Sequence, residues 1–375
     1  MTVTIGSATL HLSDCIEAMR AMPDNSVDAV VTDPPYGIRF MGKSWDSADI
    51  EARTARRRGF DSHAPDAGPN GGHNSIAAEA GLYNLTPAAM KAFQEFSLEW
   101  ATEAYRVLRP GGHLLSFSSA RTFHRMTCGI EDAGFEIRDQ IMWIYGSGFP
   151  KSHNLTGEHQ GWGTALKPAH EPICVARKSF KGTVAANVLA HGTGALNIDG
   201  CRVVAADGAN RARPPRTPNQ ILGSGNGTNL TASEHSETGR WPANLIHDGS
   251  PEVLAMFPDA KGQQGRALDD GAASGNAVYG QLRNVTTSPD PRIESETSAA
   301  RFFYCAKTSR ADRNSGLMNS STPAVARDAT MRECEQADWS TRNGNTHPTV
   351  KPTDLMAYLC RLVTPTGGIV LDPFM

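Results

Sequence analysis

Apolar and polar positions alternate with two different periods over residues 1–150, which predicts strands and helices in turn. The run Val27–Thr32 is apolar almost throughout, as in a parallel strand buried on both faces. The further predicted strands are Thr9–Leu12, His113–Ser118 and Glu136–Tyr145, and the predicted helices are Cys15–Met22, Pro87–Val107 and Thr122–Ala133. Alternation of this kind predicts a doubly wound α/β sheet.

Residues 151–300 lack this alternation of strand and helix patterns. They are rich in Gly, Asn, Thr, Ser and Pro, and their short apolar pieces include Pro172–Ala176 and Asn244–Ile246. Acidic and basic residues balance in this stretch, so it is not a basic tail. We interpret it as an inserted, irregular region.

The pattern returns to order over residues 301–375. Phe302–Ala306 is a candidate strand, Thr353–Val363 has the apolar spacing of a helix, and Gly368–Asp372 is a buried strand that ends in an acid. The sequence therefore predicts three regions, 1–150, 151–300 and 301–375.

Composition narrows the class of protein. The net charge is −3, so contact with nucleic acid would need local basic patches. Seven cysteines, none in a Cys-x-x-Cys spacing, favour neither a disulfide framework nor a metal site. There is no apolar stretch of membrane-span length and no leader pattern, so we expect a soluble, cytoplasmic protein with no membrane contact.

The chemistry is concentrated in Asp33, Pro34, Pro35 and Tyr36, which follow directly on the buried strand. Ligands of open α/β sheets bind at this carboxyl edge. The amino nitrogen of adenine or cytosine is a poor nucleophile, and two acceptors aimed at its hydrogens, the Asp33 carboxylate and the Pro34 carbonyl, favour attack on a methyl sulfonium. Tyr36 would stack on a base flipped out of the duplex. The alternative is an ordinary turn at the end of a strand.

Seven segments resemble, in order, the motifs of DNA amino-methyltransferases of the permuted (beta) class, adenine-N6 and prophage-like in type. The segments are Ser13–Cys15, Pro23–Asp28, Arg109–Gly112, Gly148–Ser152, Lys167–Glu171, His347–Pro352 and Val370–Phe374. The resemblance implies a circularly permuted, Rossmann-like methyltransferase sheet in which residues 151–300 are the target-recognition insertion. It also implies S-adenosyl-L-methionine as cofactor and double-stranded DNA as substrate.

The resemblance assigns roles to single residues. Asp33, Pro34, Pro35 and Tyr36 would hold the base, and the residues at the cofactor would be Asp14, Thr349, Lys351, Asp372 and Phe374. Asp14 is equally well explained as a helix cap, and Lys351 as a solvated lysine at a helix entry. Asp at the first motif position favours adenine, because cytosine-N4 relatives more often carry Ser there.

A long polar loop between Tyr36 and Pro87 adds candidate DNA contacts. Its arginines Arg53, Arg56, Arg57 and Arg58, together with Lys151, would bind phosphate, although a mobile polar loop explains the arginines nearly as well. In the insertion, Arg202, Arg211, Arg213, Arg216, Asn219 and Gln220 are available for base readout, and a solvated surface is the simpler explanation for each.

The family pattern continues with a glycine loop after Phe374, whereas this chain ends at Met375. We therefore expect a truncated form of a longer protein, in which the strand Thr9–Leu12 lacks a neighbour on one side. Three alternatives stay open: cytosine-N4 methylation, methylation of RNA or of a protein glutamine, and a catalytically inactive DNA-binding fragment. The sequence also leaves open whether a restriction nuclease accompanies the protein and whether it forms oligomers.

Overall fold

The structure is a computed structural model, and it describes residues 1–37, 85–148, 152–204, 239–260, 267–276, 280–287, 297–306 and 350–375. The chain divides into two compact units. The first comprises Met1–Gly200, Asn244–Ser250 and Cys305–Met375, and the second comprises Cys201–Ala243 and Pro251–Tyr304. The first unit contains nearly all of the main sheet and every residue of the site described below.

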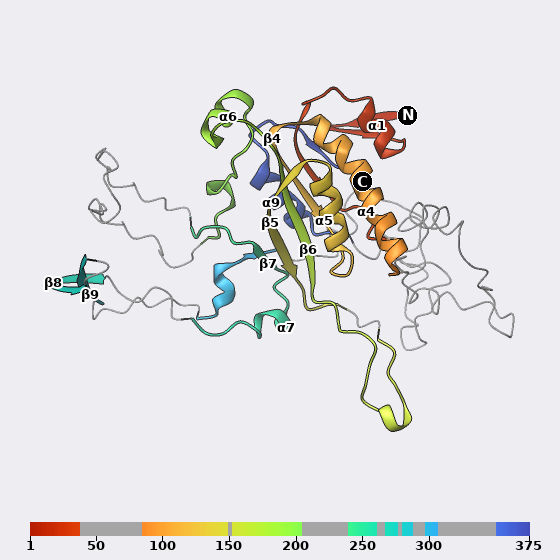
Figure 1. Cartoon of the computed structure of the whole chain (residues 1–375). Coiled ribbons are helices and arrows are strands. Elements are labelled where there is room, and N and C mark those ends of the chain that lie inside the picture. The colour runs from red at the N-terminus through yellow and green to blue at the C-terminus, as the bar shows by residue number, and fades with distance from the viewer. Residues whose placement is uncertain are drawn as a thin grey trace. The chain divides into compact units, whose positions relative to one another are not determined.

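The main sheet has seven strands in the order β10-β7-β5-β6-β4-β3-β11 (Figure 1). Their bounds are β3 Val27–Thr32, β4 Leu108–Phe117, β5 Phe135–Ile144, β6 His170–Lys178, β7 Leu245–His247, β10 Tyr304–Cys305 and β11 Val370–Leu371. β11, β3 and β4 are parallel, whereas β6 runs antiparallel to both β4 and β5. The carboxyl ends of β3, β4, β5 and β11 therefore meet the start of β6 at one edge of the sheet.

Helices cover both faces of this sheet. α4 (Pro87–Val107) and α5 (Phe123–Asp132) form one core with alternate strand residues such as Val30, Leu114 and Cys174. Their neighbours Val31, Leu115 and Ile173 are also buried but point to the other face, where α9 (Thr353–Val363) packs against β3 and β4. The predicted doubly wound α/β architecture is confirmed.

The helix boundaries follow from local sequence. Thr86 caps α4 through its hydroxyl, with Pro87 in the first turn, where a missing N–H costs no helix bond. α5 lies close to α4 at Gly129, because a Cβ there would come within 2.7 Å of the Gln94 carbonyl oxygen. α6 (Val184–His191) packs on β4, and it ends at Gly192, whose φ of +77° suits glycine.

The N-terminal strand does not lie at an edge of the main sheet, where we expected it. β2 (Ala8–His11) pairs with β1 (Thr2–Ile5) as a two-stranded antiparallel hairpin, outside the main sheet. The turn at Gly6 has a φ of +59°, which a hairpin turn requires and glycine permits. α1 (Cys15–Arg20) then leads to β3.

The prediction that residues 151–300 have little regular structure was wrong for several segments, two of which are strands of the main sheet. The apolar piece Pro172–Ala176 belongs to β6, the antiparallel partner of β5, and Asn244–Ile246 overlaps β7. Strands of a sheet buried on both faces contain short apolar runs, and such runs look alike in a loop and in a strand. The remaining elements are η3 Gly157–His159, η4 Asp199–Cys201, α7 Pro251–Leu254, β8 Ala267–Asn276, β9 Gly280–Thr287 and η5 Ala299–Phe302.

Across the described residues, no helix combines the length and the apolar character needed to cross a membrane.

Candidate active site at the carboxyl edge of the sheet

β3 delivers Asp33 to the carboxyl edge of the sheet, beside the end of β11. All six residues of β3 are buried, and its neighbours β4 and β11 are parallel to it. The hydroxyl of Thr32 donates a hydrogen bond of 2.6 Å to Oδ1 of Asp372, across 340 positions of sequence. The same oxygen accepts the backbone N–H of Phe374 at 3.1 Å. The two predicted motifs, around Asp33 and around Asp372, therefore lie side by side.

Four side chains bond to one another at this edge, and we call Asp33, Tyr36, Glu171 and Lys351 the carboxyl-edge cluster. Lys351 Nζ lies 2.8 Å from Asp33 Oδ2 and 3.1 Å from Glu171 Oε2. The Tyr36 hydroxyl lies 2.7 Å from Asp33 Oδ1 and 3.2 Å from Glu171 Oε2. Pro34, which follows Asp33 in the motif Asp33–Tyr36, is buried.

Lys351 is not a solvated lysine, because only 7% of its side chain is exposed. Burial disfavours its charge, but the carboxylates of Asp33 and Glu171 outweigh burial and raise the pKa of Lys351 above its usual range. Burial, and then the same two carboxylates, raise the pKa of Tyr36 well above its usual value. Lys351 is therefore a cation and Tyr36 a neutral hydroxyl donor at physiological pH.

Aromatic rings surround these charges. Lys351 Nζ lies 5.1 Å from the ring centre of Phe117 and 5.5 Å from that of Tyr36, within the range of cation–π attraction. The Phe374 ring packs edge-on against Trp100, at 5.7 Å, and tilted against Phe96, at 6.1 Å. Phe374 is thus held by the α4 core, while its backbone N–H fixes Asp372.

Asp372 has the features of a ligand-facing acid. Burial raises the pKa of its carboxyl, although the hydrogen bonds from Thr32 and Phe374 oppose that shift. Both of those bonds go to Oδ1. Among the residues that the structure describes, none donates a hydrogen bond to Oδ2, so this oxygen is available to a ligand.

Asp14 caps a helix, as one of the two explanations predicted. Its Oδ1 accepts the N–H groups of Ile16 at 2.9 Å and of Glu17 at 3.1 Å at the start of α1. The other predicted site residues lie outside the described part of the chain: Thr349, Lys151, Arg53, Arg56, Arg57 and Arg58.

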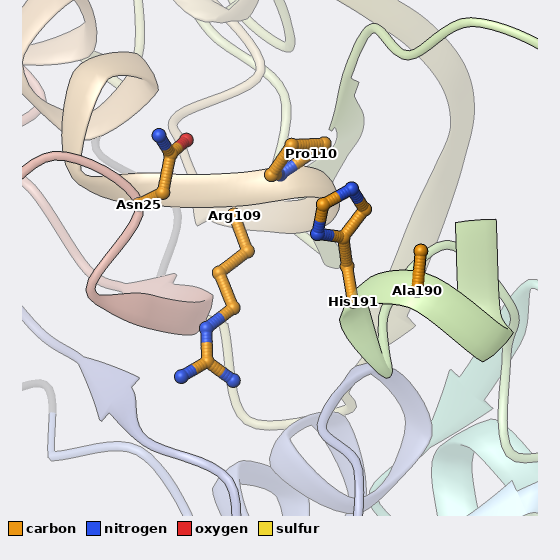
Figure 2. Close-up of a pocket in the computed structure, with 5 residues that line it drawn as sticks. All are labelled: Asn25, Arg109, Pro110, Ala190 and His191. Carbon is orange, nitrogen blue, oxygen red and sulfur yellow. The ribbon is translucent and has the colours of Figure 1, made fainter.

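The opposite edge of the sheet holds a second polar group, Asn25, Asp28, Arg106, Arg109 and Lys178, which we call the amino-edge cluster. Arg109 pairs with buried Asp28 at 2.6 Å, and Asp28 also accepts the Ile369 N–H at 2.8 Å. A pocket of about 390 Å³ lies here. Its lining residues are Asn25, Arg109, Pro110, Ala190 and His191 (Figure 2). This pocket lies at the starts of the strands, away from Asp33, and its lining contains no acid.

Sequence reasoning left three residues of the site without a role. Glu171 stands in the resembling segment Lys167–Glu171, and Thr32 and Phe117 end buried strands. The position of Thr32 beside Asp33 was the available signal for a residue at the edge. Nothing in the sequence links Glu171 to Asp33, because only the antiparallel return of β6 brings them together.

Two relatives resemble parts of the chain. The type II methyltransferase M.HindIII of Haemophilus influenzae is 24% identical over 214 residues, which are 50% of this chain and 64% of that protein. M.HpaI of Haemophilus parainfluenzae is 26% identical over 151 residues, 40% of this chain and 36% of that protein. The chain thus spans less than two thirds of the length of these curated relatives.

Solved structures are similar at a low level. A Thermus thermophilus protein solved with S-adenosyl-L-methionine is 19% identical, with a TM-score of 0.25 over 46% of this chain and 56% of that one. PvuII DNA methyltransferase, described as cytosine-N4-specific, is 14% identical, with a TM-score of 0.26 over 49% of this chain and 63% of that one.

The family model for N6/N4 methyltransferases, described as DNA methylase, matches residues 27–375. This span covers the Asp33 motif, the sheet, and the segments around Lys351 and Asp372. The match extends over most of the sequence, and the chain therefore belongs to the DNA methylase family.

Proposed function

We propose that this chain transfers a methyl group from S-adenosyl-L-methionine to the exocyclic amino nitrogen of a base flipped out of double-stranded DNA, with adenine N6 as the acceptor. One observation carries the proposal: the hydrogen bond from Thr32 to Asp372, which joins the end of the Asp33 strand to the end of the β11 strand. It supports a base site and a cofactor site that share one edge.

Asp33 supplies the base side of this proposal. Its carboxylate accepts from one N–H of the amino group, and the Pro34 carbonyl accepts from the other, which turns the nitrogen lone pair toward the methyl donor. Lys351 and the Tyr36 hydroxyl hold the two oxygens of Asp33 in place. A carboxylate oxygen can accept a further hydrogen bond, so these contacts leave room for the base.

Asp372 supports the cofactor side. Its Oδ2, which lacks a donor among the described residues, suits the ammonium of a methionine end, and Phe374 fixes the carboxylate through its N–H. We include Lys351, Thr349 and Asp14 in the proposed cofactor surroundings. When bound, S-adenosyl-L-methionine supplies a methyl group on a sulfonium, which is a strong electrophile for a weak nitrogen nucleophile.

DNA contacts complete the proposal. The part of residues 151–300 outside the main sheet acts as the target-recognition insertion, whereas its strands β6 and β7 belong to the sheet of the catalytic half, residues 1–150. Residues 301–375 act as the cofactor half. Arg53, Arg56, Arg57, Arg58 and Lys151 bind backbone phosphate near the flipped base. Replacing the four arginines by glutamine reduces the salt dependence of DNA binding; an unchanged slope would remove them from the interface.

The decisive experiment identifies the modified base. DNA incubated with the protein and labelled S-adenosyl-L-methionine is digested to nucleosides, which are separated and identified by mass. N6-methyladenine is expected. N4-methylcytosine would move the proposal to the second candidate, which the family description allows equally.

Calorimetry with S-adenosyl-L-methionine separates an enzyme from an inactive DNA-binding protein. Saturable binding of S-adenosyl-L-methionine, together with transfer of its labelled methyl group to DNA, supports the proposal. DNA binding without any cofactor binding or transfer would overturn it in favour of the inactive alternative. Transfer of label to RNA or protein, and none to DNA, would place the substrate in another class.

A further inference from the structure

Glu171 is a partly buried carboxylate that the proposed chemistry leaves without a role. It lies at the start of β6, opposite Trp143 of β5, and 16% of its side chain is exposed. Its Oε2 lies 3.1 Å from Lys351 Nζ and 3.2 Å from the Tyr36 hydroxyl. A carboxylate placed this close to another one must repel it, so its position requires compensation.

The compensation comes from two donors that Glu171 shares with Asp33. Lys351 contacts both carboxylates, and so does the Tyr36 hydroxyl, which can donate its single proton to only one of them at a time. The shorter contact is with Asp33 for both donors. Glu171 is thus the second acceptor for each group that holds Asp33.

The charges of the cluster do not cancel. Asp33 and Glu171 contribute two negative charges and Lys351 one positive charge, while Tyr36 is neutral, so the sum is −1. Without Glu171, Asp33 and Lys351 would form a neutral pair. A carboxylate fully matched by an ammonium is a weaker acceptor for a further N–H group than one in a site with surplus negative charge.

We propose that Glu171 is a positioning residue for methyl transfer. It competes with Asp33 for the Lys351 ammonium and the Tyr36 hydroxyl. Asp33 therefore remains a strong acceptor for the amino group of the base. This role rests on the proposed function. As the nitrogen–carbon bond forms and the carbon–sulfur bond breaks with its electron pair on sulfur, positive charge passes to the amino nitrogen, whose N–H proton goes to Asp33. The surplus negative charge stabilises that change.

The test compares E171Q with the control E136Q in single-turnover methyl transfer. Glu136 is also a glutamate of a main-sheet strand that pairs with a cation, Arg177 at 2.6 Å, but it stands at the opposite edge. We expect E171Q to slow the transfer rate constant by about 100-fold, with unchanged affinity for S-adenosyl-L-methionine by calorimetry. E136Q should transfer at the wild-type rate. A wild-type rate in E171Q overturns the inference.

The double variant E171Q/K351M separates a charge role from a structural one. It restores the sum of −1 through Asp33 alone, so it should transfer about 10-fold faster than E171Q. If Glu171 served only to hold Lys351 in place, the double variant would be no faster than E171Q, and the inference would fail. Thermal melting checks that both variants fold.

A readout independent of turnover is the titration of Lys351, followed by NMR of labelled lysine side chains. Loss of the Glu171 charge should lower the Lys351 pKa, and an unchanged titration would show that the two groups are not coupled. A wild-type chain that transfers no methyl group defeats the proposed function. Wild-type transfer with an unimpaired E171Q defeats only the role of Glu171.

Discussion

The two edges of the main sheet hold polar clusters that differ in composition and are bonded in different ways. At the amino edge, charged side chains form side-chain pairs such as Arg109 with Asp28, but they also bind backbone. Arg106 donates to the carbonyls of Met19 at 2.6 Å and Met22 at 2.9 Å, and Lys178 donates to that of Leu108 at 2.7 Å. At the carboxyl edge, Asp33, Tyr36, Glu171 and Lys351 bond to one another.

This difference separates charge that stabilises the fold from charge arranged for chemistry. A side chain bonded to a loop carbonyl fixes the chain path, and its loss leaves backbone groups unsatisfied. Side chains bonded to one another hold a charge pattern that a ligand can share. The largest consequences of substitution should therefore be in stability at the amino edge and in rate at the carboxyl edge.

Asp33→Asn should give the largest effect. It removes the negative acceptor while keeping the size of the side chain, and we expect methyl transfer to slow by about 1000-fold. Melting should stay near the wild-type temperature, because Lys351 keeps its contact with Glu171. Single-turnover transfer measures the rate, and thermal melting measures the stability. A rate within about tenfold of the wild-type rate would remove the distinction between the edges.

Acidification should destabilise the fold through His113, a buried residue of β4. Burial, with the charges of Arg177 and Arg138, lowers the pKa of His113 from 6.5 to about 4. As the pH falls, the unfolded chain binds a proton on His113 before the folded chain does. The stability that neutral His113 gives the fold is therefore complete above pH 6.5 and is lost as the pH falls toward 4. The loss is about 3 kcal/mol at pH 4. Denaturant unfolding at pH 7 and pH 4.5 should show a smaller difference for His113→Gln than for wild type; equal differences would contradict this account.

Asp28→Asn sharpens the comparison, because it changes the same kind of residue as Asp33→Asn at the other edge. Asp28 is 1% exposed and holds both Arg109 and the Ile369 N–H. We expect the free energy of unfolding to fall by about 2 kcal/mol. The transfer rate under folded conditions should not change. A variant with wild-type stability and a slow rate would reverse the assignment of the two edges.

Asp14→Ala should have the smallest effect. Loss of the cap on α1 lowers the free energy of unfolding by about 1 kcal/mol, and Asp14→Asn should restore it because asparagine also caps helices. Calorimetry with S-adenosyl-L-methionine on Asp14→Asn then tests the second proposed role. An affinity equal to that of wild type would leave Asp14 a structural residue.

Much of the fold was predictable because its signals are local. The predicted bounds of Val27–Thr32, Pro87–Val107 and Thr353–Val363 agree with β3, α4 and α9. The strands β6 and β7 were not predicted as part of the sheet, since three to nine residues in a polar context carry too little periodicity to distinguish a strand from a loop. The predicted place of Thr9–Leu12 at the edge of the main sheet was wrong, since β2 pairs with β1 outside that sheet, and pairing is decided between strands, not within one.

By itself, the sequence determined that Asp33 stands at the end of a buried strand, with the residue types for a base amino group beside it. It also identified the segments around Lys351 and Asp372. Only the tertiary structure decided that Lys351 pairs with Asp33, that Asp372 is tied to Thr32, and that Glu171 is the second carboxylate. Residue types and local spacing can be read from the sequence, whereas the charge balance of the site depends on which strands return to the same edge of the sheet.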